Sequence, residues 1–185
     1  MANSKFENLI LYVCRKGADD SRLGKVKLNK LLFLSDFGYY RKSGVSISGE
    51  DYMRLREGPA PRQMLPVLTS LQQSGKTRVE MVPTGLRPME RTIAVADPNL
   101  SDFSAAEISF VDSIVERYWK LTGTDLSKLT HFDFGYCAAA DRETIPYATA
   151  YMPSTVEMDV AEDGVVGRTQ ELAARFGWDA KYATA

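Results

Sequence analysis

The sequence predicts a predominantly helical α+β fold, in which a helical core carries a small antiparallel β-hairpin. Apolar residues recur at helical spacing in several stretches that end at glycines. Two short alternating segments, rich in β-branched residues, flank a proline-containing loop. The chain has 185 residues, of which 44% are hydrophobic and 25% charged, which is the composition of an ordinary globular domain.

Two helices are predicted before residue 45. The first begins where Ser4 and Glu7 have the spacing of a capping box, and it ends at Gly17. The second runs over residues 24–40 and ends by Gly44. It is apolar around much of its circumference, so we expect it at the centre of the core. Its opening turns carry three lysines: Lys25, Lys27 and Lys30.

The pattern changes between residues 46 and 75. Residues 52–56 alternate as in a short, half-exposed strand, which the run Gly58-Pro59-Ala60-Pro61 ends. A further helix is expected from about Met64 to Gly75. Within it, Pro66 either bends the helix or lies in its first turn, and both alternatives remain open.

A β-hairpin and two more helices are expected in the second half of the chain. The hairpin pairs residues 77–82 with residues 89–96 around a longer loop. Ser104 and Glu107 form a second capping box before an amphipathic stripe that continues up to Gly123. Thr124 or Asp125 is then expected to cap a helix through Leu129. An acidic extension with a short helix at about residues 168–176 is predicted for residues 154–185, after a domain that spans residues 1–153.

The net charge of −1 conceals two electrically opposite halves. Residues 1–92 contain 16 Lys and Arg against 9 Asp and Glu, and residues 93–185 contain 7 against 15. One interpretation is a basic face that meets an acidic partner or nucleic acid. The other is that the two halves pack together and neutralise each other.

The sequence offers little support for catalysis, a metal or a cofactor. The chain has one histidine, His131, with Asp133 two residues later, and no nucleophile is evident near it. No glycine pattern for phosphate binding occurs, and the pair Asp19-Asp20 is expected on a solvated turn. Cys14 and Cys137 are predicted to be separate buried thiols. With no export signal and no apolar run of membrane-spanning length, we expect a soluble cytoplasmic protein.

Basic residues near the second helix form one candidate recognition surface. If the strand at residues 52–56 lies beside that helix, then Arg54, Arg56 and Arg62 converge with its lysines. Guanidinium groups bind carboxylates or phosphates through paired hydrogen bonds. The alternative is a set of solvated charges whose stems cover the core.

Several motifs in register resemble the Panacea domain of SocA-like antitoxins. They are the stretch from Lys27 to Asp36, with Lys27, Leu28 and Lys30, then Tyr40, the run Ile47-Ser48-Gly49-Glu50 with Tyr52, the run Arg56-Glu57-Gly58-Pro59-Ala60-Pro61, and Leu129-Thr130-His131 with Asp133. The resemblance covers about residues 6–151. The chain departs from the family pattern at Tyr136, where a Trp is usual, and at Arg56-Glu57, where a Tyr is common.

The resemblance implies an antitoxin that binds and neutralises a toxin encoded beside it. Toxic small alarmone synthetases are among the toxin classes that it implies. SocA-like members are also described as adaptors that deliver a toxin for proteolysis. From the residue types near the motif, we predict six partner contacts: Tyr39, Tyr40, Tyr52, Arg54, Arg56 and Arg62. The alternatives are a nucleic-acid-binding regulator that uses the basic first half and an enzyme that uses His131 and Asp133.

Overall fold

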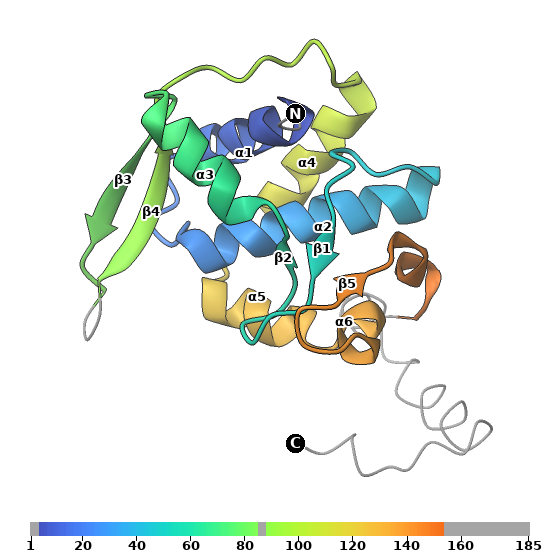
Figure 1. Ribbon diagram of the computed structural model, residues 1–185. Helices are drawn as coiled ribbons and strands as arrows, with labels where there is room; N and C mark the ends of the chain where they lie inside the picture. The colour runs from blue at the N-terminus through green and yellow to red at the C-terminus, as the bar shows by residue number, and fades with distance from the viewer. Residues whose placement is uncertain (1–3, 85–87, 154–185) are drawn as a thin grey trace, which may run out of the picture.

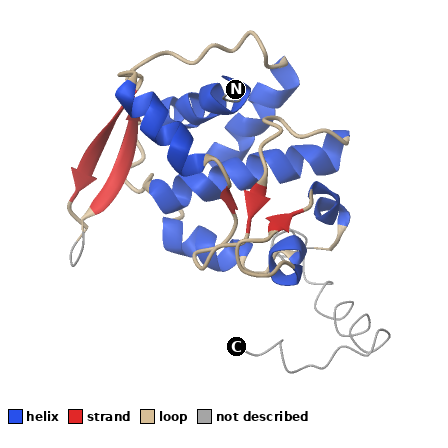
Figure 2. Cartoon of the chain, viewed as in Figure 1, coloured by secondary structure: helices blue, strands red, loops and turns tan. Residues whose placement is uncertain are grey.

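The computed structural model describes residues 4–84 and 88–153, which form a helical core with two small antiparallel sheets (Figures 1 and 2). The helices are α1 (Ser4–Lys16), α2 (Lys25–Ser43), α3 (Met64–Gln73), α4 (Ala105–Arg117), α5 (Gly123–Thr130) and α6 (Phe134–Ala138), with a 3-10 helix η1 (Tyr147–Tyr151). The strands are β1 (Tyr52–Met53), β2 (Ala60–Pro61), β3 (Thr77–Val82), β4 (Met89–Ala94) and β5 (Thr144–Ile145). The predicted α+β class, mostly helical, is confirmed.

Helix α2 lies at the centre of the core, as predicted. It packs against α1, α4, α5 and η1, and Figure 1 shows it crossing the middle of the molecule. Its buried apolar residues are Leu28, Leu31, Leu32, Phe33 and Phe37. The helix ends at Gly44, whose φ of 78° lies in the left-handed region and whose N–H donates to Tyr40 O at 2.7 Å.

The oppositely charged halves meet where α1 packs beside α4. Lys5 pairs with Glu107 at 2.8 Å, and Lys16 pairs with Asp112 at 3.2 Å. Arg15 also pairs with Asp97 in the segment that leads to α4. These contacts support the interpretation that the two halves neutralise each other where they pack.

A three-stranded antiparallel sheet in the order β2-β1-β5 corrects the predicted strand at residues 52–56. The strand ends at Met53, and Gly58-Pro59 turns the chain so that Ala60 pairs back with Met53. Pro61 is tolerated because β2 is an edge strand, which needs fewer N–H donors. Strand β5 was not predicted, since two residues are too few to show a period of alternation.

The hairpin β3–β4 is confirmed, with Thr77 opposite Ala94 and Val82 opposite Met89. In Figure 1 it projects from the left side of the helical body. Strand β4 ends at Ala94 and not at Ala96, because the N–H groups of Val95 and Ala96 both donate to Lys76 O and leave the ladder.

Several helix ends differ from the prediction by a few residues. Helix α4 has the predicted capping box of Ser104 and Glu107, but it ends at Arg117, so the expected continuation up to Gly123 was wrong. Thr122, not Thr124 or Asp125, caps α5, and Asp125 completes that capping box. Pro66 lies in the first turn of α3, where its missing N–H has no helical partner. Ser4 already lies inside α1, so it is not the N-cap.

Two further expectations were wrong, and one lies outside the described residues. Cys14 is buried but Cys137 is exposed. Asp20 is 2% exposed and not solvated, because it pairs with a buried lysine. The helix predicted at residues 168–176 falls outside the described part of the chain. Within that part, no helix is long and apolar enough to span a bilayer.

Candidate functional site

Lys27 lies in the interior, where it joins three segments. Its side chain is 1% exposed. Its Nζ donates to Asp20 Oδ2 at 2.5 Å, to Trp119 O at 2.9 Å and to Leu121 O at 2.6 Å. Burial alone would raise the pKa of Asp20, but hydrogen bonds from Lys27 and Arg22 hold it below its usual value. Lys27 therefore anchors two segments to α2: the turn after α1 and the connection between α4 and α5.

Lys30, one helical turn later, is also buried and holds the Gly-Pro run. Its Nζ donates to Pro59 O at 2.8 Å. Burial lowers the pKa of Lys30 to about 7, although the nearby Glu57 opposes this shift. Gly58 has a φ of 96°, and a Cβ there would lie 2.9 Å from Lys30 Cε and 2.9 Å from Thr130 Oγ1. Only glycine fits this turn without strain.

Helices α5 and α6 hold the rest of the loop at residues 54–59, which we call the motif loop. Ser127 Oγ donates to Glu57 O at 2.8 Å, and His131 Nε2 lies 3.1 Å from Arg56 O. Tyr136 donates its hydroxyl to Leu55 O at 3.0 Å. With the bond from Lys30 to Pro59, side chains from three helices bind four backbone carbonyls of the loop. These four side chains thus fix the shape of the loop, while the side chains of Arg56 and Glu57 stay exposed.

Two of the predicted contact residues face inward, which corrects their assignment to an exposed surface. Tyr52 is 0% exposed, and its hydroxyl donates to the buried Asp36 at 2.7 Å. Arg54 is half-buried, because its Nη1 donates to Ala139 O at 2.6 Å and its guanidinium lies 4.9 Å from the centre of the Tyr136 ring. Lys27 and Lys30 are buried as well, so the predicted convergence of lysines and arginines on one surface does not form.

Arg56 and Arg62 are exposed as expected, and the fold brings Arg142 to them. Arg62 Nη2 donates to Thr144 Oγ1 at 2.7 Å and to Arg142 O at 3.3 Å. Arg142 has a φ of 60°, the only positive φ of a non-glycine residue in the described chain, and its N–H donates to Arg54 O at 2.8 Å. We call Arg56, Arg62 and Arg142 the arginine face.

A hollow of about 440 Å³ adjoins the arginine face. Arg56, Arg142 and Lys25 line it, and so do two acidic residues, Glu57 and Asp141. Lys25 also borders a smaller hollow between α3 and the hairpin, lined by the partly exposed Leu65 and Val79. Exposed guanidinium groups and apolar side chains therefore lie on one continuous surface.

Tyr39 and Tyr40 lie elsewhere, near the end of α2. The Tyr39 ring packs edge-on against Phe110 of α4, with 5.6 Å between ring centres. Tyr40 stacks on Tyr147, with 5.2 Å between centres, and contacts Tyr151. Both are partly buried, and neither lines the hollow beside the arginine face.

His131 and Asp133 have structural roles in this fold. His131 is the C-cap of α5, and its ring packs on Tyr136 with 4.7 Å between centres. Asp133 caps α6, where its carboxylate accepts from the Tyr136 N–H at 3.0 Å. Within residues 4–84 and 88–153, no group of His, Cys, Asp and Glu could hold a metal ion.

Sequence reasoning missed Arg142 and the hydrogen bonds that Ser127 and Tyr136 donate to the motif loop. Arg142 gave no signal, because its conformation depends on pairing with Arg54, far away in the sequence. Tyr136 stands where the family usually has Trp, and in this chain its hydroxyl supplies the hydrogen bond to Leu55.

Comparison with known proteins gives one finding that fits this geometry. A family model described as antitoxin SocA-like, Panacea domain, matches residues 28–133, which is more than half of the chain. The match runs from the first turn of α2 to the cap of α6 and so contains the motif loop and three of the side chains that hold it, those of Lys30, Ser127 and His131, while Tyr136 follows its end. No curated protein and no solved structure matches the chain.

Proposed function

The chain belongs to the antitoxin SocA-like, Panacea domain family, and from this premise we propose that it neutralises a cognate toxin by binding it directly through the arginine face. The observation that carries the proposal is that side chains from three helices hold the backbone of the motif loop. Lys30, Ser127, His131 and Tyr136 all bind backbone carbonyls of the motif loop. A loop held this firmly presents its side chains to a partner with little loss of entropy on binding.

The chemistry of the face suits a protein partner that carries carboxylates. Arginine is enriched among the residues that dominate binding energy, and its planar fork pairs with carboxylates. The adjoining Leu65 is 64% exposed and Val79 is 46% exposed, which supplies apolar area beside the charges. A stable complex buries about 1,600 Å² in total. The arginine face and the surface around Leu65 and Val79 would together form one side of such an interface.

Neutralisation by occlusion requires no reaction, cofactor or metal of this chain, and we propose none. The small alarmone synthetases are one candidate class for the toxin. We expect the toxin in the cytoplasm, together with the antitoxin. Nucleic acid is a weaker candidate, because Lys27 and Lys30 are buried and several cations of α1 pair with carboxylates. A gel-shift series over increasing salt separates the two, since only a phosphate-binding protein would retard DNA without the toxin.

Growth rescue by co-expression tests this proposal. The product of the gene beside this one is expressed with the full chain, and the wild type is expected to restore growth. The triple variant Arg56→Ala, Arg62→Ala, Arg142→Gly is expected to fail. A matched control, Arg15→Ala with Lys120→Ala, removes two exposed cations that line neither hollow beside the arginine face and should restore growth fully. Rescue by the triple variant at equal protein levels would reject this surface.

A further inference from the structure

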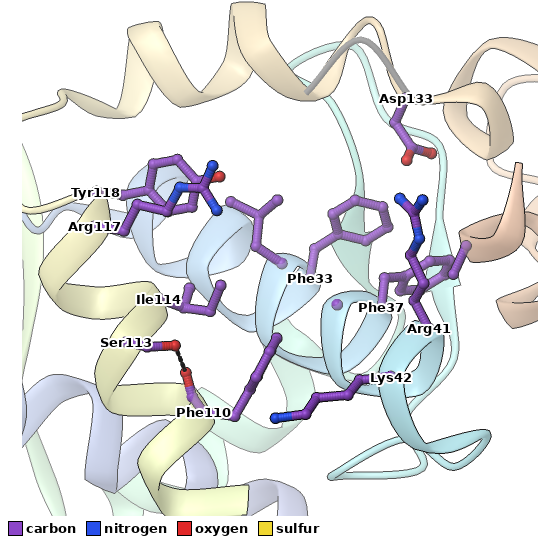
Figure 3. A pocket seen from close by; sticks show the side chains of 13 residues that line it. Phe33, Phe37, Arg41, Lys42, Phe110, Ser113, Ile114, Arg117, Tyr118 and Asp133 are labelled. Carbon is purple, nitrogen blue, oxygen red and sulfur yellow. Dashed lines mark hydrogen bonds between the residues drawn. The ribbon is translucent and has the colours of Figure 1, made fainter. Parts of the chain in front are cut away.

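A third hollow, which we call the α2–α4 groove, lies between α2 and α4, and no residue of the motif loop lines it. It has a volume of about 550 Å³. Phe33 and Phe37 of α2 and Ile114 of α4 form an apolar floor, and Figure 3 shows these side chains pointing into the space between the two helices. Phe110 closes one side.

The rim of the groove is basic. Arg41 and Lys42 project from α2, and Arg117 projects from α4 (Figure 3). In the part of the chain that the structure describes, Lys42 and Arg117 form no ion pair. Asp133 is the acidic side chain at the rim; it is buried, and its carboxylate already accepts from the Tyr136 N–H. The groove therefore suits an apolar segment that also carries carboxylates.

The chain itself leaves the described structure beside this groove. Ala150 of η1 lines the groove, and the neighbouring Tyr151 donates its hydroxyl to Tyr40 O at 3.4 Å. The description ends at residue 153, and residues 154–185 follow. From residue 153 to residue 158, five residues of extended chain reach at most about 18 Å, which suffices to bring residue 158 to the groove that Ala150 lines.

The sequence after residue 153 has the complementary pattern. Apolar Val156, Met158 and Val160 alternate with Glu157 and Asp159. Two more carboxylates, of Glu162 and Asp163, come soon after, and no basic residue occurs before Arg168. The alternation places apolar side chains on one face of an extended segment and carboxylates on the other.

We propose that residues 155–163 of this chain dock in the α2–α4 groove, with Val156, Met158 and Val160 on its apolar floor and the carboxylates toward Arg41, Lys42 and Arg117. The tether makes this binding intramolecular, so its effective concentration is in the millimolar range and modest contacts suffice. The inference does not depend on the proposed function, because it needs no toxin.

Site-specific photocrosslinking in the full chain tests the docking. Met158 is replaced by p-benzoylphenylalanine, the purified protein is irradiated, and the crosslinked peptides are mapped by mass spectrometry. We expect crosslinks to residues 33–42 or 110–118. Charge reversal at the rim, Lys42→Glu with Arg117→Glu, should lower the crosslink yield at least about fivefold, because it replaces two attractive contacts by repulsive ones.

A matched charge reversal provides the control. Arg78→Glu with Lys128→Glu changes the net charge equally at exposed sites outside the groove and should leave the yield unchanged. Circular dichroism verifies that both variants are folded. Crosslinks that map elsewhere, or that persist after reversal at the rim, would overturn the proposal. A covalent dimer would assign the groove to a second copy and would overturn it as well.

Discussion

The side chain of Lys30 passes so close to Gly58 that a Cβ atom at Gly58 would lie 2.9 Å from Lys30 Cε. The two residues are far apart in the sequence, yet each requires the other. Glycine leaves room for the buried lysine, and the lysine binds the carbonyl of Pro59 that follows the glycine. This relationship gives a physical reason for a motif that joins a lysine helix to a Gly-Pro run.

Gly58→Ala is predicted to lower the free energy of unfolding by about 2–4 kcal/mol. A side chain at a φ of 96° is strained, and the new methyl group also crowds Lys30 and Thr130. Gly75→Ala is the matched control, because Gly75 has a φ of 70° but nothing within 4 Å of the added Cβ. The control should lose only about 1–2 kcal/mol. Equal losses in urea unfolding would show that the contact with Lys30 is unimportant.

Stability is predicted to rise with pH between about 6.5 and 8.5 because of Lys30. Burial lowers the pKa of Lys30 to about 7 in the folded state, whereas the lysine in the unfolded chain keeps a pKa of about 10.4. In this window the unfolded chain binds the proton and the folded chain releases it, so raising the pH favours folding. The free energy of unfolding should rise by about 2 kcal/mol more in the wild type than in Lys30→Met. Parallel pH profiles of the two proteins would contradict this account.

Lys27→Met is predicted to be among the most damaging single changes. It leaves the carboxylate of Asp20 buried without its main partner and frees the carbonyls of Trp119 and Leu121. Breaking one side of a buried pair costs about 3–5 kcal/mol. Lys25→Met, two residues earlier and exposed, should change the free energy of unfolding by less than about 0.5 kcal/mol. Thermal and urea unfolding of both variants provide the check, and similar values would refute the buried role of Lys27.

Arg142→Gly is predicted to separate stability from binding. Glycine adopts a φ of 60° without strain, so the free energy of unfolding should stay the same or rise by up to about 1 kcal/mol. The variant still loses one guanidinium of the arginine face and should bind the toxin more weakly. Arg56→Gly is the comparison, because Arg56 has a negative φ and should lose about 0.5–1 kcal/mol. If the Arg142→Gly variant were less stable than the wild type, the Arg142 side chain would stabilise the fold.

The sequence predicted the elements whose signals are local. The capping box at Ser104, the glycine stop at Gly44 and the hairpin at residues 77–94 each depend on residues close together in the chain. Strand β5 and the conformation of Arg142 depend on pairing with β1 and with Arg54, which lie about 90 residues away, and no local pattern announces them.

The site was predicted in part, for a similar reason. Charged residues are mostly exposed, so Lys27 and Lys30 were placed on the surface, and only their distant carbonyl partners explain their burial. Tyr52 was assigned to a contact surface because of its residue type, but its hydroxyl donates a hydrogen bond to the buried Asp36. The exposure of Arg56 and Arg62 agrees with the prediction, and their role as contacts remains a prediction.

Titration calorimetry of the full chain with the purified product of the adjacent gene tests the central claim most directly. We predict a saturable complex whose Kd rises at least about thirtyfold in the Arg56→Ala, Arg62→Ala double variant, while the Arg15→Ala, Lys120→Ala control binds like the wild type. Absence of a complex with the wild type, or an unchanged Kd in the double variant, would contradict neutralisation through the arginine face.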